Sequence, residues 1–108
     1  MGEIVKRICA ELELDPPAAE RLVRTFLRAT AEDLRLIEES VALGRAAGIA
    51  EPAHSIKGAA ANLDFQVARR AAVELEALGK SGQIGQARAH LDALRREMER
   101  IRSDIEAG

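Results

Sequence analysis

The sequence is poor in the residues that mark several classes of protein. Its 108 residues include one cysteine, no tryptophan, no tyrosine and two phenylalanines. Cys9 has no partner in the chain for a disulfide and falls in an apolar helical pattern, which indicates a buried small side chain and a reducing compartment. No apolar run approaches membrane-spanning length, and the first residues lack the apolar segment of a signal peptide. We therefore expect a cytoplasmic protein that does not bind a membrane.

The charge and the hydrophobic composition narrow the class further. A net charge of −2 and a pI near 5.7 provide no electrostatic basis for binding nucleic acid. Hydrophobic residues make up 47% of the chain and aromatic residues only 2%, so the core has to be built from leucine, isoleucine, valine and alanine. That composition is typical of a helical bundle, and the length fits one domain spanning residues 1–108.

Apolar residues recur at helical spacing through almost the whole chain. We expect a short helix from Glu3 to Leu12, and a long one that begins after Asp15-Pro16-Pro17 and ends near Gly44. A helix around His54 and another from about Phe65 to Leu78 follow, and Gly79-Lys80-Ser81-Gly82 then breaks the chain. A last helix carries an unbroken apolar seam with spacings of three and four, at Ile84, Ala87, Leu91, Leu94, Met98, Ile101 and Ile105.

The order and the lengths of these segments predict their arrangement. Short connections force long helices to fold back on their neighbours, so we expect an all-α protein. Its architecture would be an antiparallel up-down-up-down four-helix bundle with a short extra N-terminal helix. The charged positions of the last helix, Glu97 among them, should face solvent.

The helix around His54 carries the most informative motif of the chain. Ala53, Ile56, Ala60 and Leu63 form its apolar stripe, and His54 lies about 100° of rotation from Ala53, so its imidazole should reach solvent. Lys57 and Gly58 follow His54 by three and four residues and share its face of the helix. Glycine inside a helix costs about 0.5 to 1 kcal/mol relative to alanine, so something other than helix formation favours Gly58.

This motif, His54-Ser55-Ile56-Lys57-Gly58, resembles the His-x-x-Lys-Gly signature of histidine-containing phosphotransfer (Hpt) domains. The resemblance extends from Asp15 to Ile105 and includes the sequence Ala61-Asn62-Leu63 after the motif. It implies that His54 accepts a phosphoryl group from a receiver-domain aspartate and passes it to another receiver. It also implies that Lys57 neutralises phosphate charge, and that Gly58 leaves room for the partner.

The same resemblance implies a partner for the imidazole on the next helix. Members of the family often place a polar residue there, and the matching position is Glu76. A glutamate could accept the Nδ1 proton of His54, or it could be an exposed charge one step from the core position Leu75. Both interpretations stay open at the level of the sequence.

Two positions depart from the family pattern. Asp64 stands where the family usually has glycine, and we expect it to cap the following helix. Pro52 removes a backbone donor two residues before His54, so the helix should bend there or begin near Glu51.

No other enzyme apparatus is recognisable in the sequence. His90 has no lysine-glycine companion, and two histidines with one cysteine at wide spacing do not form a zinc site. Without a phosphate-binding loop or a nucleophile elbow, we expect a carrier without kinase activity rather than an enzyme. The chain would need no cofactor of its own, because receiver domains supply Mg²⁺.

The resemblance therefore predicts a monomeric phosphorelay intermediate. Its partners would be the receiver domains of a hybrid histidine kinase and of response regulators. Two alternatives stay open: a helical adaptor that docks receivers without chemistry, and the phosphoacceptor domain of a chemotaxis-type kinase.

Overall fold

The computed structural model of the chain describes residues 1–107 and is helical throughout. Its α-helices are α1 (Glu3–Leu12), α2 (Pro16–Ala42), α3 (Ala50–Asn62), α4 (Gln66–Ser81) and α5 (Ala87–Glu106). Single 3₁₀ turns, η1 (Ala46–Gly48) and η2 (Ile84–Gln86), precede α3 and α5. None of these helices is long and apolar enough to cross a membrane, as judged over the described residues.

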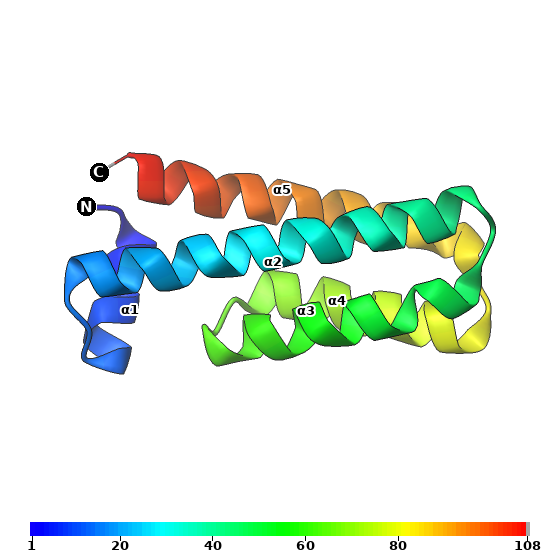
Figure 1. Ribbon diagram of the computed structural model, residues 1–108, viewed down its shortest axis with the longest axis horizontal. Coiled ribbons are helices and arrows are strands. Elements are labelled where there is room, and N and C mark those ends of the chain that lie inside the picture. Colours follow the sequence, from blue (N-terminus) through cyan, green and yellow to red (C-terminus); the bar gives the residue numbers. More distant parts are fainter. Residues whose placement is uncertain (108) are drawn as a thin grey trace.

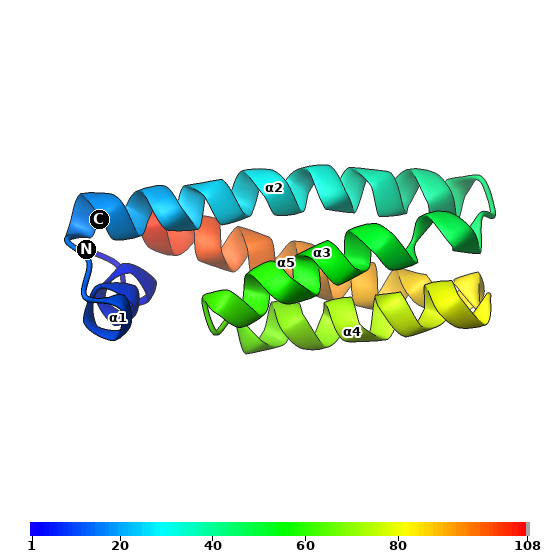
Figure 2. The same ribbon diagram turned by 60° about the horizontal axis from the view of Figure 1, so that its bottom comes forward.

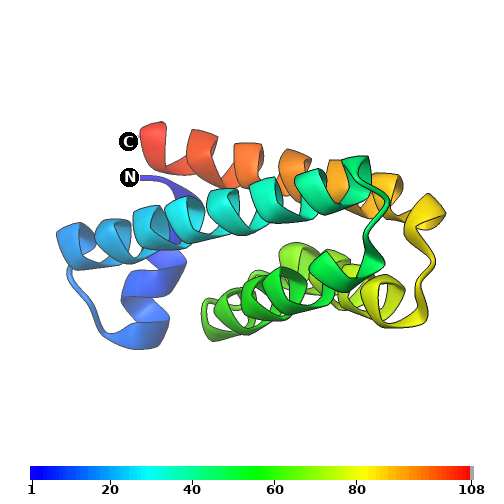
Figure 3. The same ribbon diagram turned by 45° about the vertical axis from the view of Figure 1, so that its right-hand side comes forward.

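Helices α2 to α5 run alternately in opposite directions and form a bundle (Figure 1). The shorter helices α3 and α4 lie side by side along one half of the long helices α2 and α5 (Figures 1 and 2). Helix α1 lies across the other end of the bundle, beyond the turn that joins α3 to α4 (Figure 3). The predicted up-down-up-down bundle with an extra N-terminal helix is confirmed.

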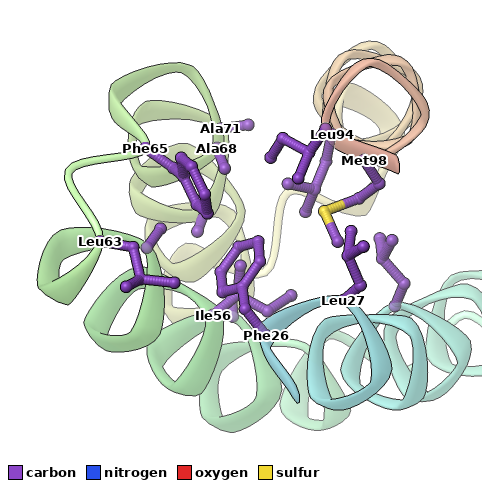
Figure 4. Close-up of a cluster of buried hydrophobic side chains, with 14 of the residues drawn as sticks. Phe26, Leu27, Ile56, Leu63, Phe65, Ala68, Ala71, Leu94 and Met98 are labelled. Atoms are coloured by element: carbon purple, nitrogen blue, oxygen red, sulfur yellow. The ribbon is translucent and has the colours of Figure 1, made fainter. Parts of the chain in front are cut away.

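The apolar seams predicted from the sequence meet in the core. The stripe of α3 is fully or nearly fully buried, as is the seam of α5 from Ala87 to Ile105. Phe26 of α2 and Phe65 before α4 meet with their ring centroids 4.9 Å apart, and Leu94 and Met98 of α5 approach from the opposite side (Figure 4). Burial of these side chains contributes most of the stability of a bundle with so few aromatic residues.

Helix α1 is held by polar contacts with the C-terminal part of α5 and with the turn between α3 and α4. The carboxylate of Asp104 on α5 accepts hydrogen bonds from the backbone N–H groups of Glu3 and Ile4, at 3.0 and 2.9 Å. It thereby caps the N-terminus of α1, which its own sequence leaves without a capping side chain. Arg7 donates to the carbonyl oxygen of Leu63 at 3.0 Å, and its guanidinium lies 5.6 Å from the ring centroid of Phe65.

The start of α2 follows the sequence expectation. Asp15 is the N-cap, and its carboxylate accepts a hydrogen bond from the N–H of Ala18 at 2.9 Å. Pro16 and Pro17 occupy the first turn, where a missing N–H leaves no helical hydrogen bond unmade. Pro52 is accommodated in the same way, because α3 begins at Ala50, close to the expected Glu51.

Two expectations about side chains were wrong. Asp64 does not cap α4, whose N-cap is Phe65; instead Asp64 adopts a left-handed conformation with φ 55° in the turn and accepts a hydrogen bond from Gln66. Glycine adopts this conformation most readily, and aspartate tolerates it better than most other residues. Glu97 does not face solvent: it is buried and paired with Arg100 on the next turn of α5.

The break expected at Gly79 was also wrong. Helix α4 continues through Gly79 and Lys80 to Ser81, and it ends at Gly82, which has φ 78°. A Cβ atom at position 79 would lie 2.7 Å from the backbone nitrogen of Ala50 and 3.1 Å from its Cα. Gly79 therefore allows close contact between α4 and the start of α3, and it does not end the helix.

We expect Gly79→Ala to destabilise the protein despite the higher helix propensity of alanine. The added methyl group has to displace the backbone of Ala50, and overpacking of this kind costs about 1 to 3 kcal/mol. Gly58→Ala is the matched control, because a Cβ atom there would meet no atom of residues 1–107 within 4 Å outside its own helix backbone and sequence neighbours. It should raise the free energy of unfolding by about 0.5 to 1 kcal/mol. Denaturant unfolding of both variants checks this, and equal stability would contradict the contact at Gly79.

Candidate functional site

Helix α3 presents His54 on its outer face. The four apolar residues of its inward stripe fix the rotation of the helix, which places His54 at the boundary with solvent. The imidazole side chain is 67% exposed, as the sequence predicted. Lys57 is half-buried on the side of α3 that faces α4, and Gly58 is exposed one turn beyond His54.

Glu76 of α4 lies beneath the imidazole and ties the two helices together. Glu76 as a whole residue is only 8% exposed. Its Oε2 is 2.8 Å from Nδ1 of His54, and its Oε1 accepts a hydrogen bond from Nζ of Lys57 at 2.7 Å. Of the two interpretations that the sequence left open, the structure excludes the exposed charge.

Close packing of α3 on α4 makes this contact possible. Small residues line the facing surfaces of the two helices, among them Ala53 and Ala60 of α3 and Ala72 and Gly79 of α4. Small side chains let the helix axes approach closely, so that a glutamate on one helix reaches two side chains of the other. Glu76 adjoins the core residue Leu75 and is covered by the same packing.

The contacts of Glu76 determine its protonation state. Its hydrogen bond with Lys57 is the main cause that lowers the pKa of Glu76 from 4.5 to about 2; burial opposes this shift, and the hydrogen bond with His54 reinforces it. The carboxylate is therefore ionised at neutral pH and can only accept hydrogen bonds. A neutral imidazole beside it carries its proton on Nδ1, which leaves Nε2 with a free electron pair.

Lys80 is a fifth residue of the site, and the sequence pattern did not lead us to predict it. Its Nζ lies 3.6 Å from Oε2 of Glu76, the same oxygen that contacts His54, and its side chain is 70% exposed. The predicted chain break over residues 79–82 includes Lys80, although Lys80 follows Glu76 by four residues. A glutamate followed by a lysine four residues later is a favourable pair on a continuous helix. The sequence therefore contained a pattern from which contact between Glu76 and Lys80 could have been predicted.

Gly58 leaves the surface beside His54 open. The space around it is empty of side chains from the rest of the described chain, so the fold itself does not require glycine there. The half-buried Ala59 and the exposed Asn62 continue this side of α3 toward an apolar groove of about 270 Å³, formed with residues of α1 and α2 that include Leu12, Leu22 and Phe26. A partner that reaches His54 therefore meets a low, partly apolar surface.

The remaining candidates lie outside this cluster. His90 is partly exposed on α5, which contributes no residue to the contacts of Glu76. Within residues 1–107 no group of three or more histidine, cysteine, aspartate or glutamate side chains is arranged to hold a metal ion. The cluster combines one nucleophilic nitrogen with an ionised carboxylate and two lysines.

Comparisons with known proteins agree with the fold and with the family that the sequence resembles. The family model described as Hpt domain matches residues 21–104. The crystal structure of histidine-containing phosphotransfer protein B (HptB) from Pseudomonas aeruginosa PAO1 is similar to this chain, with a TM-score of 0.78 and 24% sequence identity. The similarity covers 96% of this chain and 88% of that one, and it shows that the two share a fold. A search of curated proteins found no significant match.

The pKa of Glu76 predicts how its contribution to stability depends on pH. A carboxyl group whose pKa is lower in the folded than in the unfolded protein stabilises the fold above its unfolded pKa, near 4.5, and this stabilisation disappears as the pH falls toward about 2. Glu76→Gln removes the charge. The difference in the free energy of unfolding between the wild type and Glu76→Gln should thus be constant from pH 7 to about 5 and shrink below that.

Denaturant unfolding at a series of pH values measures this difference. Glu74→Gln is the matched control, because Glu74 is an exposed glutamate on the same helix. A difference for Glu76→Gln that does not change between pH 5 and pH 2 would contradict the lowered pKa.

Proposed function

Because the chain belongs to the Hpt-domain family, we propose that it is a phosphorelay intermediate in which His54 carries the phosphoryl group. Members of this family carry phosphoryl groups without kinase apparatus and work with receiver domains. In our proposal His54 accepts the group from a receiver-domain aspartate and passes it to the aspartate of a second receiver. The observation that carries the proposal is the contact between Nδ1 of His54 and the buried carboxylate of Glu76.

Glu76 would prepare the imidazole for nucleophilic attack. With its proton held on Nδ1 by the carboxylate, the ring offers the free electron pair of Nε2 to phosphorus. The Nε2–P bond forms as the bond between phosphorus and the aspartyl oxygen breaks, and the aspartate leaves as a carboxylate. Delivery to the second receiver is the reverse of this step, and it restores the neutral imidazole.

Lys57 would balance the charge of the transferred group. Phosphoryl transfer depends chiefly on positioning and on neutralisation of the negative charge of the phosphoryl oxygens. Lys57 is on the same face of α3 as His54, three residues further along, so its ammonium group is within reach of a phosphoryl group on Nε2. In our proposal the receiver supplies Mg²⁺ and the acidic pocket that holds it.

The surface around His54 suits a globular partner in the cytoplasm. Gly58 and Ala61 are exposed beside the imidazole and present little or no side chain, which lets the partner's backbone come close. The groove that includes Leu12, Leu22 and Phe26 adds an apolar contact on the same side of α3. We propose that the receivers of a hybrid histidine kinase and of response regulators dock here on a monomer.

Replacement of the histidine tests the proposal directly. We expect His54→Gln to abolish acceptance of phosphate from a phosphorylated receiver. Because the side chain is mostly exposed, the helix content should stay the same, and the free energy of unfolding should change by less than about 0.5 kcal/mol. The measurement is acid-labile, base-stable phosphate on the chain. His90→Gln should accept phosphate at the wild-type rate.

Four results would contradict this proposal or favour one of its alternatives. Phosphate on His54→Gln, or its loss in His90→Gln, would overturn the assignment of the histidine. A wild-type chain that binds receivers but never becomes phosphorylated would be an adaptor. Phosphorylation by an ATP-binding kinase domain, with none from receivers, would identify a phosphoacceptor domain of the chemotaxis type.

The open surface at Gly58 makes a separate prediction. Gly58→Gln should slow transfer from a receiver about tenfold or more, because a side chain there holds the partner away from the imidazole and transfer is sensitive to such displacement. Phosphorylation by phosphoramidate, a small donor that needs no docking, should proceed at the wild-type rate. If Gly58→Gln accepts phosphate from the receiver as fast as the wild type, close approach at this position is not required.

A further inference from the structure

The distribution of lysine in the chain is uneven. Lysine occurs at positions 6, 57 and 80 only, and the other thirteen basic residues are arginines. Two of the three lysines converge on the carboxylate of Glu76, at 2.7 and 3.6 Å, whereas arginine makes nearly all the other ion pairs of the described chain. The positions around Glu76 therefore use a type of cation that the rest of the chain almost avoids.

One lysine would be enough to neutralise Glu76. With an ionised carboxylate, two ammonium groups and a neutral imidazole, the cluster carries a net charge of +1 before any phosphate arrives. Transfer of a PO₃⁻ group to Nε2, with the proton kept on Nδ1, lowers the net charge of the cluster by one, because the phosphoryl oxygens carry a charge of about −2 while the ring gains one positive charge. The second lysine thus supplies a positive charge that the resting site does not need and that the phosphorylated site lacks if Lys57 acts alone.

We propose that Lys80 exchanges roles with Lys57 when His54 is phosphorylated, an inference that rests on the function proposed above. Lys57 leaves Oε1 of Glu76 and contacts the phosphoryl oxygens, and Lys80 closes from 3.6 Å to hydrogen-bonding distance of the carboxylate. Glu76 then keeps a cation and continues to hold Nδ1–H of His54. Lys80 is thereby a positioning residue that acts on the imidazole through Glu76.

The chemistry of lysine and the exposure of the two side chains fit this exchange. The ammonium group of lysine is a point charge at the end of a flexible side chain and changes partners readily. The guanidinium group of arginine, in contrast, binds a carboxylate through two parallel hydrogen bonds. The side chain of Lys80 is 70% exposed and free to move, and it extends from α4, one turn beyond Glu76. Lys57 is 32% exposed and shares a helix face with His54, so the phosphoryl group comes within its reach.

Lysine side-chain NMR provides the direct test. A chain labelled with ¹⁵N and ¹³C in lysine contains only three ammonium groups, and Lys6→Gln, Lys57→Gln and Lys80→Gln assign them. On phosphorylation of His54 with phosphoramidate, the signals of Lys57 and Lys80 should both shift, and that of Lys6, which pairs with Glu3 away from the site, should stay. In Glu76→Gln the Lys80 signal should not respond. A Lys80 signal that is unchanged by phosphorylation of the wild type overturns the exchange.

Phosphorylation rates provide a second and independent test. At low ionic strength, removal of one positive charge from the cluster around Glu76 should make Lys80→Gln accept phosphate from phosphoramidate about three- to tenfold more slowly. High salt should reduce this difference because Lys80 is exposed, and Lys80→Arg should restore the rate because it keeps the charge. Lys6→Gln is the control and should match the wild type.

The outcomes separate this inference from the proposed function. Equal rates for Lys80→Gln and the wild type at low salt overturn the role of Lys80 and leave the phosphorelay intact. A wild-type chain that is phosphorylated on His54 neither by phosphoramidate nor by a receiver overturns the proposed function and the exchange together.

Discussion

The site depends on one buried carboxylate. Glu76 contacts His54 and Lys57 on the neighbouring helix and Lys80 on its own, and burial beside Leu75 holds it in place. Burial of an unpaired carboxylate is energetically unfavourable, so Glu76 can be buried at this position only because its cationic partners lie beside it. The alanines and the glycine between α3 and α4 are needed for the same reason, because larger side chains would move Glu76 out of reach of the imidazole.

The rest of the bundle positions this pair of helices. Helices α3 and α4 are shorter than α2 and α5, and α1 lies across the end that they leave open (Figure 1). Asp104 fixes the start of α1 to α5, and Arg7 fixes its other side to the turn after α3. Contacts far from His54 therefore tie the C-terminal end of α3, through α1, to α5.

Much of this arrangement could be predicted from the sequence, because it follows from local periodicity. The inward stripe of α3 fixed the outward direction of His54, and Asp15 with two prolines fixed the start of α2. Burial of Glu76 could not be predicted in this way. Its position on α4 adjoins the core, and whether such a position is covered depends on how closely another helix approaches, which periodicity does not contain.

The errors have a common physical origin in residues whose role depends on a distant contact. Gly79 was interpreted as a helix break because glycine has a low helix propensity, but its role is to make room for Ala50, and this error concealed Lys80. Asp64 was expected to be an N-cap. It instead adopts a left-handed backbone conformation, which aspartate also tolerates, in the turn between α3 and α4. Glu97 was expected to be exposed because charged residues on an amphipathic helix usually face solvent. Its burial depends on the N-terminal half of α1, which lies beside it.

The exposure of the His54 imidazole bears on how one receiver could be selected over another. His54 is on an outer helix face with two-thirds of its side chain exposed to water, so residues 1–107 do not enclose the imidazole. Under the proposed function, a phosphoryl group on His54 would be open to every receiver that can dock, and transfer would run in either direction according to the relative free energies of the two phosphorylated partners. Selectivity between receivers would then reside in how well and how long each one docks, and the lifetime of the phosphorylated state would set the time within which a receiver has to arrive.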